Sequence, residues 1–162
     1  MCPLKASALV NPTEKFYVND YANILSSETE NYIFEHSKNL NDKTKAQIVV
    51  VTIPSLDGDS LEEYATDLFR KFGIGDEKEN NGLLILLALE DRKVRVEVGY
   101  GLEGILPDGK TGRFQDTYMI PFFKEDNFDE GMLNGYKAFY KEIANYYNLD
   151  EEIDSPIEEE DD

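Results

Sequence analysis

The amino-acid sequence predicts an α/β protein, specifically a three-layer α/β/α sandwich built around a small mixed sheet. Three observations carry this prediction: two short, continuously apolar runs, an amphipathic helical pattern between them, and a strictly alternating segment directly after the second run. A strand, a helix and a second buried strand form a βαβ crossover, so the first two strands are expected to be parallel. Further helical patterns before and after the strands supply cover for both faces of the sheet.

The first predicted helix precedes the sheet's first apolar run. It starts at Ser26 or Ser27, because Ser27 followed three residues later by Glu30 fits a capping box. The residues at helical spacing that would face the core form only a narrow stripe, which consists of Ile33, Ser37 and Leu40. This segment is therefore expected to be a surface helix with one thin buried face.

The βαβ unit follows. Residues 47–53 (QIVVVTI) and 83–89 (LLILLAL) are continuously apolar, which is typical of strands buried on both faces. Between them, Ser60 and Glu63 fit a capping box and Gly73 supplies the stop signal of an amphipathic helix. The apolar face of that helix consists of Leu61, Ala65, Leu68, Phe69 and Phe72.

The remaining elements complete the sandwich. After a polar turn at 90–93, residues 93–98 alternate strictly, which predicts an antiparallel strand with one exposed face near the edge of the sheet. Asp108 is expected to cap a helix that runs to about Tyr118, and Pro121 breaks it. A last helix starts at Asn127, and its apolar residues are Met132, Tyr136, Phe139, Tyr140, Ile143 and Tyr147.

The length of 162 residues and the distribution of charge predict one domain with two loose ends. We expect a loose N-terminus over residues 1–15, a single domain over 16–149 and a disordered acidic tail over 150–162. The tail holds nine acidic residues and no basic one, and the rest of the chain keeps 25 acidic and 16 basic residues. A net charge of −18 argues against nucleic-acid binding, since that affinity comes largely from Lys and Arg.

Several site types are excluded by the residue inventory. Cys2 and His36 are the only residues of their types, so neither a disulfide nor a structural zinc site can form within the chain. Residues 99–104 (GYGLEG) match G-x-G-x-x-G, but they follow the second arm of a hairpin rather than open a helix in a βαβ unit. The sequence therefore argues against nucleotide binding, and it offers no activated nucleophile for a triad hydrolase.

A candidate cation site follows from the predicted hairpin. Its geometry places the start of the second strand (80–82) beside the end of the third (99–101), with Glu103 and Asp108 a few residues further on. Amides, carbonyls and carboxylates are the ligands that calcium and magnesium prefer. Two interpretations stay open: a divalent-cation site, or glycines that serve a tight turn with Asp108 as a helix cap.

Strings along residues 18–143 resemble the TPM domain family. They include VNDYANIL, QIVVVTI, LFRKFGIG, NNGLLILLA and DRKVRVEVGYGLEGILPD, all in one order. The family is known from thylakoid-lumen proteins of photosystem II repair, an animal receptor-auxiliary protein and bacterial membrane-anchored ectodomains. The resemblance implies an α/β/α sandwich and an exported, extracytoplasmic domain held by a nearby membrane anchor.

The resemblance also implies function. The family is associated with divalent-cation binding and, in some members, a weak acid phosphatase activity. The residues matching its motifs, and so implied as metal ligands, are Asp20, Asn81, Gly99, Glu103 and Asp108. The chain departs from the family at Asn80, where Asp is common, and at Pro107, where Thr is common; the lost carboxylate should weaken cation affinity.

Two functions follow as hypotheses. We favour a membrane-tethered extracytoplasmic module that assists assembly or maintenance of a membrane protein complex, linked to calcium or magnesium. Its partner would be a membrane protein or membrane complex. The alternative is a weak, metal-assisted acid phosphatase, for which only Arg113 among the arginines lies close in sequence to the hairpin motifs.

The native reading frame is predicted to encode a signal peptide upstream and an apolar segment of about 20 residues downstream. The small residues Ala6, Ser7 and Ala8 resemble a signal-peptidase site, and the acidic tail suits a spacer. Sequencing the complete open reading frame checks this. A frame that begins at Met1 and stops at Asp162 would remove the tether.

Overall fold

The computed structural model of the protein describes residues 9–149 and 155–158. Its sheet has four strands in the order β1 (Val18–Asp20), β2 (Gln47–Ile53), β3 (Gly82–Ala88) and β4 (Lys93–Val98). The first three are parallel and β4 is antiparallel to β3. The predicted mixed sheet, its parallel βαβ unit and the edge position of β4 are confirmed, whereas the short strand β1 was not predicted.

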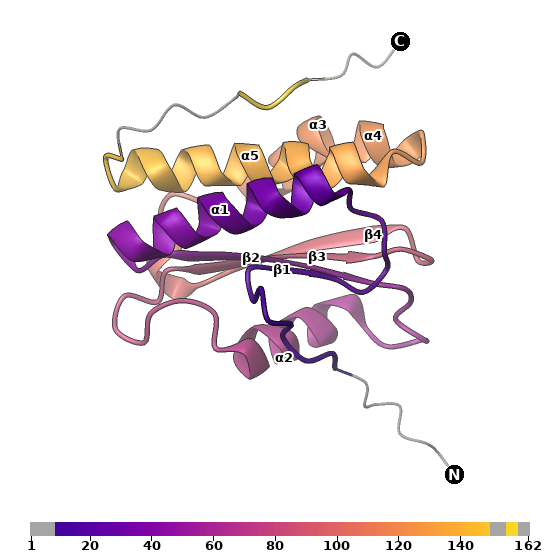
Figure 1. The fold of residues 1–162 in the computed structure, drawn as a ribbon, viewed down its shortest axis with the longest axis horizontal. Helices are drawn as coiled ribbons and strands as arrows, with labels where there is room; N and C mark the ends of the chain where they lie inside the picture. Colours follow the sequence, from indigo (N-terminus) through magenta and orange to yellow (C-terminus); the bar gives the residue numbers. More distant parts are fainter. Residues whose placement is uncertain (1–8, 150–154, 159–162) are drawn as a thin grey trace.

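Helices cover both faces of this sheet (Figure 1). One face carries α2 (Leu61–Phe72). The other carries α1 (Ser27–Thr44), α3 (Asp108–Tyr118), α4 (Ile120–Lys124) and α5 (Phe128–Tyr146). The predicted three-layer α/β/α sandwich is therefore confirmed.

The two apolar runs form the centre of the molecule because each contributes to two separate cores. In β2, Ile48 and Val50 pack in the core beneath α1 and α5, whereas Val49 and Val51 pack in the core beneath α2. All seven residues of β3 are buried. Alternate side chains of a strand point to opposite faces, so a strand between two helical layers must be apolar at every position.

Most helix ends lie where the sequence signals put them. The Ser60 hydroxyl accepts a bond from the Glu63 amide, and Gly73 ends α2 with a φ of 61°. At α1 the cap is Ser26, whose hydroxyl accepts from the Thr29 amide, so the predicted Ser27 capping box is one residue late. Asp108 is the first residue of α3 and makes no side-chain cap bond, which differs from its predicted capping role.

The described parts of the two chain ends contact the domain. Val10 donates its amide to the Tyr64 hydroxyl (3.3 Å) and Thr13 donates to the Asn19 side chain (2.8 Å), so residues 9–13, predicted to be loose, lie against β1 and α2. Within the predicted disordered tail, Ile157 is hydrogen-bonded to α5, and residues 150–154 and 159–162 lie outside the described residues. No helix in the described part of the chain is long and apolar enough to cross a bilayer.

Candidate functional site

The hairpin rim, residues 79–82 and 99–101, brings together the segments that the sequence analysis expected to be neighbours. The Gly99 amide donates to the Gly82 carbonyl and the Gly101 amide donates to the Asn80 carbonyl, both at 2.8 Å. Tyr100 lies between the two glycines and starts a short 3₁₀ turn, Tyr100–Leu102. The predicted juxtaposition at the start of β3 and the end of β4 is thus confirmed.

Close backbone approach explains why glycine occupies both positions. A Cβ atom on Gly99 would lie 2.5 Å from the Asn80 carbonyl oxygen, and one on Gly101 would collide with the Glu79 carbonyl oxygen. Any side chain there would push the two backbone segments apart. The backbone of Tyr100 is therefore fixed on both sides by Gly99 and Gly101, yet the residue itself is 81% exposed.

Asn81 stabilises the rim through hydrogen bonds of its buried side chain. Its residue is fully buried, its Oδ1 accepts from the Asp76 amide (3.1 Å), and its Nδ2 donates to the Tyr147 hydroxyl (2.8 Å). Burial raises the pKa of the Tyr147 phenol, and the bond from Asn81 opposes that rise. The second Nδ2 contact, to the Thr44 carbonyl, ties in the end of α1. Asn81 therefore fastens three chain segments together.

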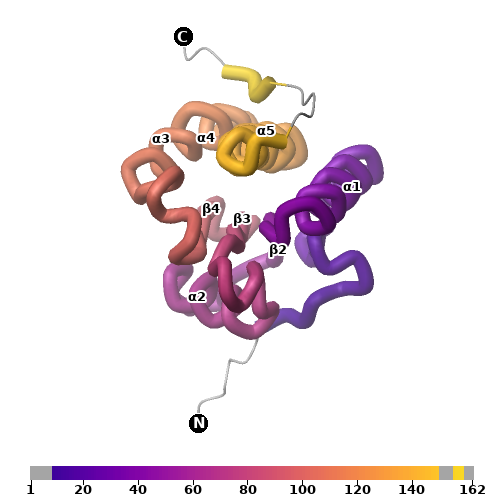
Figure 2. The backbone as a smooth tube through the Cα atoms, turned by 90° about the vertical axis from the view of Figure 1, so that its left-hand side faces the viewer, coloured from indigo at the N-terminus to yellow at the C-terminus, as the bar shows by residue number. Residues whose placement is uncertain are grey.

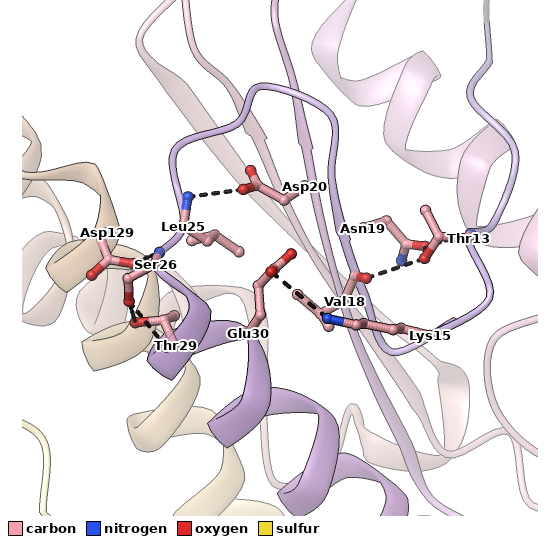
Figure 3. Close-up of polar contacts among 10 residues, drawn as sticks. All are labelled: Thr13, Lys15, Val18, Asn19, Asp20, Leu25, Ser26, Thr29, Glu30 and Asp129. Carbon is pink, nitrogen blue, oxygen red and sulfur yellow. Dashed lines mark hydrogen bonds and ion pairs between the residues drawn. The ribbon is translucent and has the colours of Figure 1, made fainter.

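Asp20 lies at the opposite end of the strands from the rim, as its pairing shows. Asp20 pairs with Thr52 near the end of β2, whereas the rim is next to Gln47 at the start of β2, about 16 Å away at the usual rise per residue. One Asp20 oxygen accepts from the Ile24 amide and the Thr52 hydroxyl, and the other accepts from the Leu25 amide (Figure 3). These bonds hold the loop that leads into α1.

Glu103 and Asp108 are exposed and line one surface hollow of about 310 Å³ beside β4. Arg95 and Glu97 line the same hollow. The Arg95 guanidinium pairs with Glu97 (3.2 Å) and with Glu62 of α2 (3.8 Å). The sequence analysis missed Arg95, although the alternation in 93–98 had placed it on the outward face of the strand that ends at the rim.

The five residues implied as metal ligands thus do not converge. Asn81 and Gly99 belong to the rim, Glu103 and Asp108 share the hollow, and Asp20 is at the far edge. Within residues 9–149 and 155–158, no three His, Cys, Asp or Glu side chains are grouped so that they could hold a metal ion. The pair in the hollow presents exposed carboxylates, whereas the Asp20 and Asn81 side chains are engaged by protein donors and acceptors.

Comparison with protein families gives the class of protein. The model of the TPM domain matches residues 18–142, which is most of the chain. The chain therefore belongs to the TPM domain family. The curated proteins include no match.

Solved structures agree with this fold. The N-terminal domain of a protein from P. gingivalis is 36% identical, with a TM-score of 0.76 over 85% of this chain and 88% of that one. BA42 from Bizionia argentinensis is 22% identical, with a TM-score of 0.63 over 76% and 84%. The N-terminal domain of cg2496 from Corynebacterium glutamicum is 17% identical, with a TM-score of 0.60 over 90% and 89%. The last two show the fold alone.

Calcium titration separates the two carboxylate positions. We expect weak binding at Glu103 and Asp108, with a dissociation constant from about micromolar to about millimolar. Asp108→Ala should abolish the NMR chemical-shift changes that saturate with added calcium. The control variant Asp57→Ala, at an exposed aspartate, should keep them. Asp20→Ala should keep them too, but lower the free energy of unfolding by about 2 kcal/mol in urea, because the part-buried amides of Ile24 and Leu25 lose their acceptor. Shifts that Asp20→Ala abolishes would contradict this assignment.

Proposed function

We propose that this chain is a membrane-tethered, extracytoplasmic binding module that assists assembly or maintenance of a membrane protein complex. The single observation that carries the proposal is the presentation of Tyr100, which is 81% exposed on a turn anchored by two backbone bonds. A side chain on a fixed turn loses less freedom on binding. Tyrosine is also among the residues that dominate binding energy at interfaces.

The surroundings of Tyr100 support a protein partner. Glu79 and Asn80 at the rim are exposed, and Asn81 holds the segment beneath them to α1 and α5. The chain's net charge of −18 favours a basic partner surface and disfavours an anionic lipid surface. A divalent cation at the Glu103 and Asp108 hollow would reduce this charge locally.

Membrane tethering is part of the proposal and rests on the family. The TPM domains that the sequence resembles are usually exported and anchored. The 36% identical structure from P. gingivalis is the N-terminal domain of its protein, and an anchor placed after such a domain would fit this arrangement.

Site-specific photo-crosslinking tests the binding proposal. A benzophenone amino acid at position 100 should crosslink to an integral membrane protein in membranes of the source organism. The matched control is position 21, because Tyr21 is also exposed but follows β1 at the far edge. Tyr100→Ala should weaken the association by about tenfold or more, with unchanged circular dichroism. Equal crosslinking from both positions would contradict a rim interface.

A weak, metal-assisted acid phosphatase is the second candidate, and one observation favours it. Arg95 lines the hollow that contains Glu103 and Asp108, so a cationic group and two carboxylates face one space. A divalent cation held there would supply a Lewis acid for a phosphoryl oxygen. Against this, the Arg95 guanidinium is already paired with Glu62 and Glu97, which reduces its attraction for a dianionic substrate.

Turnover of an aryl phosphate distinguishes the two candidates. We expect less than about 1 s⁻¹, below the range usual for enzymes, because the chain is strongly acidic and Arg95 is neutralised. Activity that requires added magnesium and is lost in Asp108→Ala, but kept in Asp57→Ala, would favour the phosphatase. Tens of turnovers per second by the purified chain would contradict the binding-module proposal.

A further inference from the structure

The tail segment 155–158 is attached to α5 through the side chain of Asn134. Ile157 donates its amide to Asn134 Oδ1 at 2.6 Å, and its carbonyl accepts from Asn134 Nδ2 at 2.6 Å. Asn134 Nδ2 also donates to the Tyr118 carbonyl at 2.9 Å. One amide side chain thus pairs with both backbone groups of one tail residue, as a neighbouring strand would.

Burial makes this pairing more than a surface contact. With residues 155–158 in place Asn134 is only 5% exposed, and a buried amide that lacks partners is costly. Tyr118 satisfies one donor position inside the fold, while the oxygen is matched by the Ile157 amide. Asn134 therefore directs a donor and an acceptor outward, at the spacing of an extended peptide backbone.

A hollow of about 390 Å³ lies beside this clamp, between α1, α4 and α5, and Ile157 forms part of its wall. Its other lining residues include Tyr32, Leu133 and Lys137 together with the acidic Glu28, Asp129 and Glu130. Residues 155–158 lie over α5 on the side away from the sheet (Figure 2). Ser155 is 3.5 Å from Lys141 Nζ and Ile157 is at Asn134, so the tail runs antiparallel to α5.

The domain contacts the tail mainly through the tail's backbone. Ile157 remains 60% exposed, so its side chain buries little surface, whereas both of its backbone polar groups are paired. Lys141 adds a contact from its Nζ to the Ser155 hydroxyl at 3.5 Å. The feature recognised on the tail side is thus its extended backbone.

We propose that the face of α5 turned away from the sheet is a docking site for an extended peptide, with Asn134 as its backbone clamp. Its resident occupant is residues 155–158 of the same chain. Because the tail is joined to α5 by a short connection, the effective concentration of this occupant is high, and a similar peptide from elsewhere must compete with it.

Docking also sets the path of the chain. The start of α5 is next to the start of α1, where the Ser26 amide donates to Asp129 at 2.8 Å (Figure 3). A tail that runs antiparallel to α5 is therefore directed toward the Asp20 edge of the sheet and away from Tyr100.

Hydrogen exchange measured by NMR on the full chain tests the docking. The Ile157 amide should exchange at least about tenfold more slowly than an unstructured amide. Ile157→Ala should keep this protection, because the clamp pairs with backbone. Ile157→Pro removes the donor without touching the folded domain, so the Asn134 side-chain amide signals should shift. A peptide of residues 150–162 added to Ile157→Pro should restore them.

Variants on α5 provide a second readout. Asn134→Ala should abolish the Ile157 protection, and Asn145→Ala, an exposed asparagine on the same helix, should keep it. A rapidly exchanging Ile157 amide in the native chain would overturn the clamp. Equal shifts of the Asn134 side-chain amide signals in Ile157→Ala and Ile157→Pro would overturn it too. Protection that rises with protein concentration would show a second copy's tail on this face of α5 and overturn the assignment of the occupant.

Discussion

The parallel pairing of β2 and β3 is the interaction on which the rest of the structure depends. The two strands pair over seven positions, from Gln47 with Gly82 to Ile53 with Ala88, and every residue of β3 is buried. Strands of this kind cannot face water on either side, so helices are required on both faces. The α/β/α layers, the crossover through α2 and the edge position of β4 all follow from that requirement.

The same pairing places the candidate functional features at the two opposite ends of the strands. Parallel strands place the starts of β2 and β3 at one edge, where β4 ends and the glycines bring Tyr100 to the surface. The end of β1 is at the other edge, where Asp20 holds the loop into α1. A carboxylate at one edge cannot share a cation with groups at the other, because the length of the strands lies between them.

Helix α5 connects these edges through buried polar groups. Near its end, Tyr147 accepts a hydrogen bond from Asn81 beneath the rim. In its first half, Asn134 pairs with Tyr118 and with the tail. Buried amides are stable only where their partners are held in position, so both asparagines fix chain segments that hydrophobic packing alone would leave less specified.

The sequence by itself determined β2, β3, β4 and the ends of α2, because their signals are local: apolar runs, strict alternation, Ser60 and Gly73. It also placed the two sides of the rim together, since a hairpin fixes which ends meet. Tertiary structure alone decided the rest. Asp20 joins Thr52, Arg95 meets Glu62, and Asn134 binds Ile157, each across more than 20 residues of chain. Such contacts depend on how whole layers pack, and no short-range pattern of residues encodes them.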